Sequence, residues 1–241
     1  MIILSVSGVS NWPANAQHPL YTNRWFSSLS KAQQVSLFGA AKSMIMSDGQ
    51  LFAAQGEPVR KRGDGFAVLM DGLMKICSSS TEGHEAILGY VRPGQWFGEL
   101  ALIDGASRER DFFSVGSSEV LVIEPDTMQT LLKDGHLAFQ IARLLALRTR
   151  ALLSLAEGFT LRKSLARTAR RLVMLAYDDE AESGLHHSSL DVSQDALASM
   201  LGMTRQSVAS QLRLLAERGA IEQAYGRIII TSMPDLMAQA S

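Results

Sequence analysis

The spacing of apolar residues divides the chain into a segment of short strands followed by a segment of helices. Between Asp48 and Pro125, short apolar runs are interrupted by glycines at positions 49, 56, 63, 65, 72, 83, 89, 94, 98, 105 and 116. Short strands at regular spacing with glycine turns are typical of a small barrel or of two packed sheets. This pattern predicts a jelly-roll-like β domain over residues 25–135.

The clearest local feature of this β segment is an Asp-Gly pair between two apolar runs. Residues 66–70 are followed by Asp71 and Gly72 and then by the run 73–77. Asp-Gly readily adopts the positive φ angles of a tight turn, so the two runs are predicted to form a β-hairpin. Further strands are predicted at 86–91 and 120–123.

The residues before the β segment predict a short helical entry. Leu29, Gln33 and Leu37 have helical spacing, and Ser28 or Ser30 can cap a helix, so one or two short helices are expected from Trp25 to about Met46. Residues 1–24 show no periodicity and are interpreted as an irregular N-terminal arm.

Helical periodicity begins after the β segment, and Gly135 is expected to divide it into two helices. The second helix, over about 136–157, has a leucine-rich face that includes Leu145 and Leu152. That face is too long for a small β domain to cover, so a second copy of the chain is the expected cover, with these two leucines at the interface. A core helix within one chain is the alternative. Gly158 is expected to mark a hinge, which bounds this segment at 136–158.

Two short helices joined by a glycine turn follow at 193–215. Ser193 can cap the first helix, Gly202 can take the positive φ of the turn, and Thr204 can cap the second. In the second helix, the apolar residues Val208, Leu212 and Leu215 form one stripe. Residues outside this stripe are the candidates for DNA contact, and those in the first turn, Arg205 and Gln206, are the candidates for reading bases. The full set predicted to contact DNA is Thr204, Arg205, Gln206, Ser207, Ser210 and Arg213.

A hairpin is predicted after this helix pair, over residues 220–231. It has the form of a wing beside a helix-turn-helix, and Arg227 in it is a candidate phosphate contact. A basic stretch upstream contains Arg162, Lys163, Arg167, Arg170 and Arg171 and no acidic residue, so it could face DNA phosphates or could be a solvated helix face.

Composition restricts the class of protein. The 241 residues are 46% apolar and 20% charged with a formal net charge of −1, so DNA contact would need a local basic patch. Cys77 is the single cysteine, so neither a disulfide nor a cysteine-held iron–sulfur cluster is expected, and the setting is predicted to be cytoplasmic. No export signal and no apolar run of about 18 residues is present, so no membrane span is expected.

Two groups of segments resemble the CRP/FNR superfamily of transcription regulators. The segments VSQDALASMLGMTRQSV (192–208), LRLLAERGAI (212–221) and YGRI (225–228) are similar to its DNA-binding half, and GYVRPGQWFGELALIDG (89–105) with Arg108 looks like its cyclic-nucleotide cassette. The resemblance implies an α+β chain: an N-terminal β-roll sensor domain, a long dimerisation helix, and a C-terminal winged helix-turn-helix at 159–241. It also implies a homodimer that binds double-stranded DNA and contacts RNA polymerase.

The same resemblance identifies an effector pocket with altered chemistry. Gly98, Glu99, Leu100 and Arg108 match the residues that hold cyclic AMP in nucleotide-binding members of the family. Those members have a hydroxyl residue where this chain has Glu109, whose carboxylate would repel a phosphate. The positions that hydrogen-bond adenine fall on Leu152 and Leu153, which offer no polar atom.

Cyclic AMP is therefore disfavoured, and the effector is left unknown. An empty pocket in which Glu99 or Glu109 pairs with Arg108 is the favoured interpretation, with a different effector as the alternative. Haem is not excluded as a cofactor, because His18, His84 and His136 are present, although no pair of them has a diagnostic spacing. No metal site is predicted, and Cys77 is expected in the core.

Two other function classes are alternatives to transcription regulation. An enzyme is disfavoured because the chain shows no nucleophile–base pair, no cluster of metal ligands and no P-loop. A cyclic-nucleotide-binding protein that acts through protein contacts is the second rival, and the helix pair at 193–215 argues against it.

Overall fold

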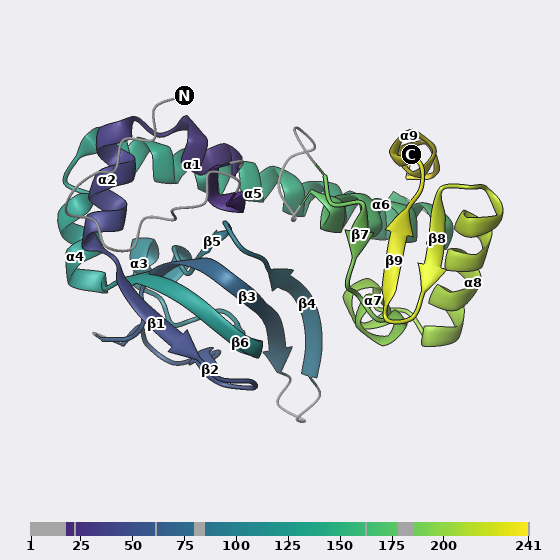
Figure 1. Ribbon diagram of the computed structural model, residues 1–241, viewed down its shortest axis with the longest axis horizontal. Coiled ribbons are helices and arrows are strands. Elements are labelled where there is room, and N and C mark those ends of the chain that lie inside the picture. The colour runs from purple at the N-terminus through teal and green to yellow at the C-terminus, as the bar shows by residue number, and fades with distance from the viewer. Residues whose placement is uncertain are drawn as a thin grey trace. The chain divides into compact units, whose positions relative to one another are not determined.

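The computed structural model describes residues 18–21, 23–60, 62–79, 85–161, 163–177 and 186–240. The chain forms two compact units, residues 1–143 and 144–241. Figure 1 labels the elements of both units.

The first unit is built on an antiparallel sheet. Its strands are β1 (Lys42–Met46), β2 (Leu51–Ala53), β3 (Phe66–Ser79), β4 (Glu85–Val91), β5 (Trp96–Phe97) and β6 (Asp111–Ile123). The order is β1-β6-β3-β4, with β2 paired to β6 and β5 paired to β3, so the long strands β3 and β6 are the centre of the sheet. The predicted β fold of this segment is confirmed.

The hairpin predicted at Asp71 and Gly72 is wrong. Strand β3 runs without a turn from Phe66 to Ser79 and pairs with β6 over most of its length, while the register shifts on either side of Asp71. Gly72 has φ +91°, and a Cβ there would lie 2.5 Å from the Ser117 carbonyl oxygen. The positive φ of this glycine serves a β-bulge within a strand instead of a turn between two strands.

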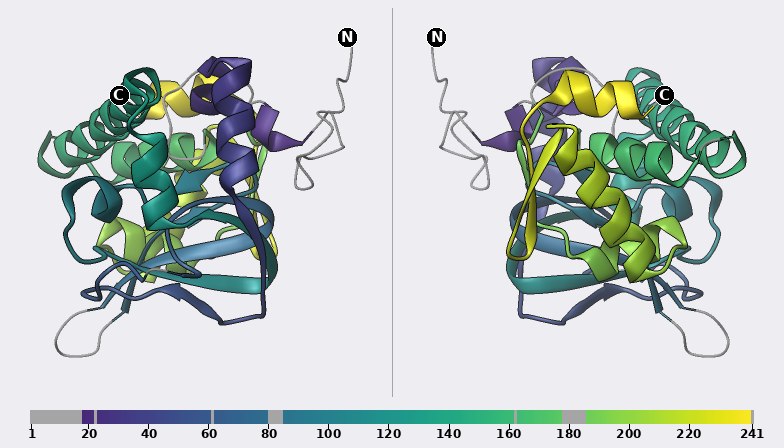
Figure 2. Two further views of the ribbon diagram at one scale, coloured as in Figure 1. Left: turned by 90° about the vertical axis from the view of Figure 1, so that its left-hand side faces the viewer. Right: turned by 90° about the vertical axis from the view of Figure 1, so that its right-hand side faces the viewer.

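Short helices precede and follow the strands of the first unit. They are the 3₁₀-helix η1 (Pro19–Tyr21), α1 (Arg24–Ser28), α2 (Lys31–Ala40), α3 (Leu100–Asp104) and α4 (Pro125–Leu131). Ser30 caps α2 in a reciprocal capping box with Gln33, which confirms one of the two predicted caps. The helical expectation to Met46 was too long, because Lys42–Met46 pairs with β6 as strand β1. Helices α2 and α4 pack beside each other at one end of the strands (Figure 2).

The residues expected as an irregular arm divide into two parts. Residues 1–17 lie outside the described residues. From His18 onward the chain belongs to the first unit, because His18 Nε2 donates a hydrogen bond to the Met70 carbonyl at 2.7 Å and Leu20 is fully buried. The arm as predicted was therefore too long at its C-terminal end.

Aromatic side chains fill the space between the N-terminal helices and the sheet. Trp96 contacts the rings of Trp25, Phe26, Phe38 and Phe66, with centroids 4.9–6.3 Å apart. Burial of large aromatic surfaces is a main source of stability in small domains, and it attaches α1 and α2 to the strands. Cys77 is buried in β3, as expected.

Helix α5 extends from Gly135 to Leu161, four residues beyond its predicted end. Gly135 is its first residue, which confirms two helices after the strands. Gly158, expected to mark a hinge, lies inside α5 and does not end it. Leu137, Ile141 and Leu144 form the buried stripe of this helix.

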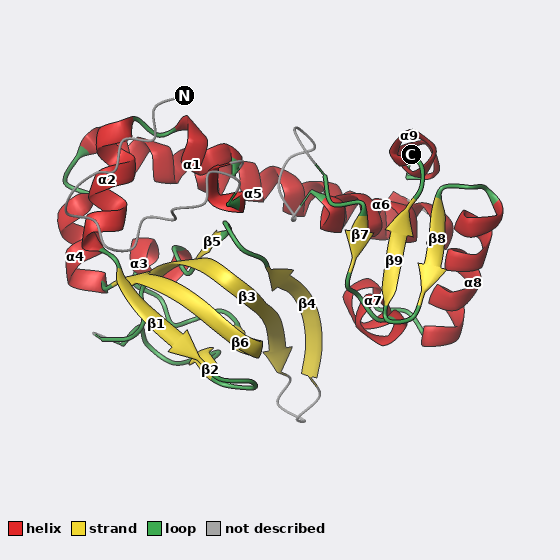
Figure 3. Ribbon diagram, viewed as in Figure 1, coloured by secondary structure: helices red, strands yellow, loops and turns green. Residues whose placement is uncertain are grey.

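The second unit contains the predicted helix pair and wing (Figure 3). Its elements after α5 are α6 (Ser164–Ala176), β7 (Ser189–Leu190), α7 (Gln194–Leu201), α8 (Arg205–Glu217), β8 (Ile221–Ala224), β9 (Arg227–Ile230) and α9 (Met233–Gln239). The three strands form a small antiparallel sheet in the order β7-β9-β8, in which β7 contacts α6 and β8 contacts α8.

Candidate nucleic-acid interface and effector pocket

The helix pair α7–α8 begins and ends at the residues that the sequence predicts. The Ser193 hydroxyl accepts a hydrogen bond from the Ala196 amide at 3.1 Å, and the Thr204 hydroxyl accepts one from the Ser207 amide at 3.1 Å. Gly202 ends α7 in the left-handed conformation with φ +59°. These local bonds determine where the chain turns, so both helix starts were readable from sequence.

One face of α8 is buried and another is open to solvent. Val208, Leu212 and Leu215 are fully buried against the rest of the second unit. The exposed residues of α8 and its cap include Thr204, Arg205, Gln206, Ser210 and Arg213, while Ser207 is half-buried. Polar side chains that can donate or accept hydrogen bonds are therefore exposed at the start of α8 and further along it.

Arg205, at the start of α8, faces an acidic residue of α7. Its Nε lies 3.6 Å from Asp195 Oδ1, and each side chain is 67% exposed. Further along α8, the Ser210 hydroxyl donates a hydrogen bond to the Gln206 carbonyl at 3.1 Å. The Ser210 hydroxyl thus bonds to the backbone of its own helix.

The basic stretch on α6 faces inward over most of its length. Arg167 Nη2 donates to the Leu201 carbonyl, Arg170 Nη2 donates to the Ser154 hydroxyl at 2.8 Å, and Arg171 is buried with its Nε 3.4 Å from Met200 Sδ. These arginines connect α6 to α5 and α7, so phosphate contact by them is not supported. Lys163 is exposed, and Arg162 lies outside the described residues.

The wing is a two-stranded hairpin with an open tip. Strands β8 and β9 pair from Ile221 with Ile230 to Ala224 with Arg227, as predicted. Arg227 is exposed beside the turn, and Tyr225 at the turn is fully exposed. The tip therefore presents one cation and one aromatic ring to solvent.

In the first unit, Gly98 and Arg108 form part of a tightly packed cluster. Arg108 Nη1 donates to the Gly98 carbonyl at 2.8 Å, and its Nη2 donates to the Gly65 carbonyl at 3.0 Å and forms a salt bridge with Asp64. Gly98 has φ +85°, and a Cβ there would lie 2.5 Å from the Gly65 carbonyl oxygen. Only glycine fits this position without strain.

The salt-bridge partner of Arg108 is Asp64, where Glu99 or Glu109 was expected. The side chains of Arg108 and Asp64 are 1% and 2% exposed, so the pair is buried. Asp64 also accepts hydrogen bonds from the Arg60 and Gly65 amides. Asp64 was not predicted from the sequence, because Asp64 precedes Arg108 by 44 residues. The only sequence signal for Asp64 was its position, a charged residue shortly before an apolar strand.

The remaining predicted pocket residues differ in exposure. Glu99 is buried at the start of α3, Leu100 is exposed on that helix, and Glu109 is half-buried. Leu152 and Leu153 are 65% and 58% exposed on α5 and belong to the second unit. Their role beside the pocket residues of the first unit stays a prediction.

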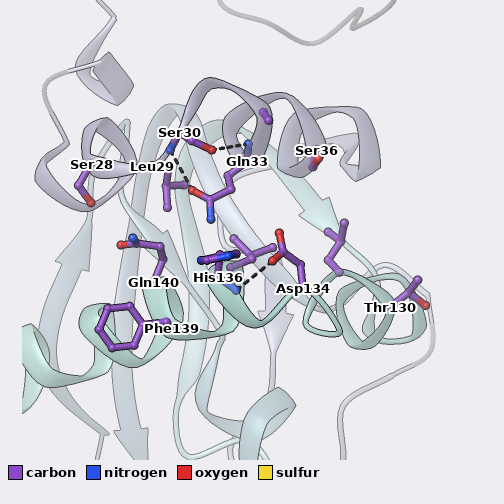
Figure 4. A pocket seen from close by; sticks show the side chains of 13 residues that line it. Ser28, Leu29, Ser30, Gln33, Ser36, Thr130, Asp134, His136, Phe139 and Gln140 are labelled. Atoms are coloured by element: carbon purple, nitrogen blue, oxygen red, sulfur yellow. Dashed lines mark hydrogen bonds between the residues drawn. The ribbon is translucent and has the colours of Figure 1, made fainter.

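A different pocket, of about 650 Å³, opens between the N-terminal helices and the start of α5 (Figure 4). Ser30 and Gln33 from the start of α2 lie opposite Asp134 and His136 at the α4–α5 turn. The Asp134 carboxylate accepts a hydrogen bond from the His136 amide at 2.9 Å. None of the predicted effector-pocket residues lines this pocket.

Two side chains of the first unit have shifted pKa values. Burial raises the pKa of Tyr90 on β4, so its phenol is neutral at physiological pH. A hydrogen bond from Lys42, with Nζ 2.7 Å from Oε2, lowers the pKa of Glu124. Neither residue belongs to the predicted effector pocket.

The described residues support neither a metal site nor a membrane-spanning helix. Among them, no three His, Cys, Asp or Glu side chains gather in an arrangement suited to a metal ion. His18 is bonded to the Met70 carbonyl, and His84 lies outside the described residues. Within the same ranges, no helix has the length and apolar character needed to cross a bilayer.

Two family models match the chain, one in each unit. The cyclic nucleotide-binding domain matches residues 46–134, and the Crp-like helix-turn-helix domain matches residues 166–239. The transcriptional regulator SdrP of Thermus thermophilus is 30% identical over 172 residues, which are 70% of this chain and 80% of that protein. A CRP-like cAMP-activated global transcriptional regulator of Mycobacterium tuberculosis is 25% identical over 194 residues, 80% of this chain and 85% of the relative.

Solved structures of other proteins share this fold. A CRP-family transcriptional regulator from Thermus thermophilus superposes with a TM-score of 0.60 at 25% identity, over 82% of this chain and 96% of the other. FixK2 from Bradyrhizobium japonicum gives a TM-score of 0.69 at 14% identity, over 83% of this chain and 98% of that chain, and so shares the fold.

Proposed function

The chain belongs to the CRP/FNR family of transcription regulators, and we propose that it acts as a homodimer that reads an inverted repeat in double-stranded DNA. A regulator of this family is not an enzyme. Its proposed place of action is the cytoplasm, with DNA and RNA polymerase as its partners.

The open face at the start of α8 is the observation that carries this proposal. Arg205 and Gln206 are exposed in its first turn, while the buried side chains of Val208 and Leu212 hold α8 in the second unit. Arginine suits the O6 and N7 acceptors of guanine, and glutamine suits N6 and N7 of adenine. The polar residues proposed to contact the neighbouring backbone or bases are Thr204, Ser207 and Arg213, and Arg227 of the wing is proposed to contact a phosphate.

Helix α5 supplies the proposed dimer surface. Six exposed residues on it are spaced alternately by three and four positions, and we call this row the α5 seam: Phe139, Ala142, Ala146, Thr149, Leu153 and Ala156. A 3.5-residue spacing is the pattern by which two helices wind around each other. The small residues in the middle of the α5 seam allow the two helix backbones to approach closely.

The two leucines predicted at the interface flank the α5 seam. Leu145 is half-buried and Leu152 is exposed, and each lies one residue before a position of the seam. In a parallel pair of helices these flanking positions face the partner at the edge of the contact. Leu145 and Leu152 are therefore proposed as rim residues around a centre formed by Ala146, Thr149 and Leu153.

Cyclic AMP is proposed not to switch this protein. Both terminal nitrogens of Arg108 already donate to Gly98, Gly65 or Asp64, and its Nε is buried. Glu109 follows directly and would repel a phosphate. The sensor domain is instead proposed to be a structural scaffold or to take an effector of other chemistry.

Calorimetry with cyclic AMP tests this part of the proposal. No saturable heat is expected from the full chain at micromolar to millimolar nucleotide. Micromolar binding that Arg108→Ala abolishes would contradict the proposal and restore Arg108 as a phosphate ligand. Such binding, without retention of the chain on DNA at moderate salt, would favour a regulator that acts through protein contacts.

Selection of binding sequences from a random DNA pool tests the reading function itself. The wild-type chain is expected to select two inverted half-sites about one helical turn apart, each with a guanine opposite Arg205. Arg205→Ala is expected to lose the preference for that guanine. A wild-type pool without an inverted repeat, or an unchanged guanine preference in Arg205→Ala, would refute the proposal. A uniform loss of affinity would reassign Arg205 to phosphate contact.

A further inference from the structure

We propose that Asp195 is a specificity-determining residue that orients Arg205 for guanine. The inference rests on the proposed DNA-reading function and deepens it, because it assigns a second residue to the choice of base. Asp195 itself is not proposed to touch the DNA bases.

The geometry pairs two helices at their N-terminal ends. Asp195 lies in the first turn of α7 and Arg205 in the first turn of α8, with Asp195 Oδ1 3.6 Å from Arg205 Nε. Both side chains are 67% exposed, so the pair lies on the open surface where DNA is proposed to bind. A carboxylate at this place attracts the guanidinium in the free protein.

The edge of the guanidinium that faces Asp195 determines which edge is left for DNA. Arginine presents its donors in a rigid planar fork, and Nε lies on the side edge of that fork. With Asp195 beside Nε, the end edge formed by the two Nη atoms remains open. Two parallel hydrogen bonds from that edge match the O6 and N7 atoms of guanine.

The pair is better explained by positioning than by stability. An ion pair with both partners two-thirds exposed contributes little to folding, because water screens it and two side chains lose freedom. When DNA covers the pair, water leaves and the attraction between the charges strengthens. Asp195 would then hold the planar fork in one orientation while guanine is bound.

Asp195 also imposes a cost on DNA affinity. A negative charge beside the DNA backbone repels phosphates, so it weakens binding to every sequence alike. Retaining the carboxylate therefore favours discrimination between sequences over total affinity. This predicts opposite changes in affinity and specificity when the charge is removed.

Competition binding with the full-length chain and Asp195→Asn tests the proposal. The probes are the operator selected by the wild type and the same duplex with the guanine at the Arg205 position replaced by adenine. Asp195→Asn should lower the guanine preference by about threefold to tenfold, a part of the discrimination that one bidentate pair supplies. It should also bind random-sequence DNA about twofold to fivefold more tightly at low salt.

Two further variants separate positioning from simple charge removal. Glu217→Gln removes the same charge at an exposed position about 18 Å further along the α8 axis, and should leave the guanine preference unchanged. In an Arg205→Ala background, Asp195→Asn should no longer alter the preference, because the residue through which it acts is gone.

The outcomes distinguish this inference from the proposed function. If Arg205→Ala loses the guanine preference but Asp195→Asn keeps it, the role of Asp195 is refuted while the reading function stands. If Asp195→Asn changes all sequences equally, the carboxylate acts only by repulsion and the inference is also refuted. If the wild type selects no operator, the reading function itself fails.

Discussion

Removal of the charge on Arg108 should destabilise the first unit more than any loss of an exposed ion pair. Arg108→Met leaves the Asp64 carboxylate buried at 2% exposure without its cation. Loss of one partner of a buried salt bridge costs about 3–5 kcal/mol. For a chain of this size, each kcal/mol lowers Tm by about 2–4 °C, so a decrease of roughly 6–20 °C is expected.

Urea unfolding followed by tryptophan fluorescence measures this loss within one unit. Trp25 and Trp96 are buried in the first unit, so their fluorescence reports the unit that contains Arg108. Lys42→Met is the matched control, because it breaks the partly buried pair with Glu124 in the same unit, whose Lys42 side chain is 69% exposed, and should have a much smaller effect.

A double-mutant cycle tests whether Arg108 and Asp64 stabilise the first unit as a pair. Arg108→Met with Asp64→Asn removes both charges, so the double variant should lose far less stability than the sum of the single variants. Strictly additive losses, or a loss below about 1 kcal/mol for Arg108→Met, would show that the buried pair does not organise this cluster.

Two further predictions concern the dimer surface and a shifted carboxyl group. Ala146→Glu places two like charges in the middle of the α5 seam and should yield monomers in sedimentation, whereas an unchanged mass would locate the interface elsewhere. Lys42→Met should raise the pKa of Glu124 toward its usual value, as NMR titration of its carboxyl carbon would measure. In the wild type, the hydrogen bond from Lys42 to the ionised Glu124 stabilises the fold at pH values above the usual pKa of a glutamate. This contribution is lost as the pH falls through the lowered pKa of Glu124. The variant should therefore lose less stability on acidification.

Elements with local signals were predicted well from the sequence. Ser193, Gly202 and Thr204 determine the ends of α7 and the start of α8 through hydrogen bonds to residues three or four positions away. The wing follows from one short turn between two apolar runs. Such signals need no knowledge of distant partners, so the candidate DNA-reading face could be located before the structure.

Features that depend on distant residues were not predictable in the same way. Asp71 and Gly72 have the composition of a hairpin turn, but β6 is long enough to pair with both halves of β3 and makes the glycine a bulge. Arg108 has its partner 44 residues earlier, and Arg170 and Arg171 face α5 and α7 instead of solvent. Charge in a sequence does not reveal which neighbouring element will bury it.

The most direct test of the central claim is the stoichiometry and spacing dependence of the DNA complex. Native mass measurement on the selected duplex should give two copies of the 26.2 kDa chain per duplex. Insertion of about 5 bp between the half-sites turns one of them to the opposite face of the helix, and should abolish tight binding, while insertion of about 10 bp should restore part of it. One copy per duplex, with an affinity that the insertion of about 5 bp leaves unchanged, would contradict a dimeric reader of an inverted repeat.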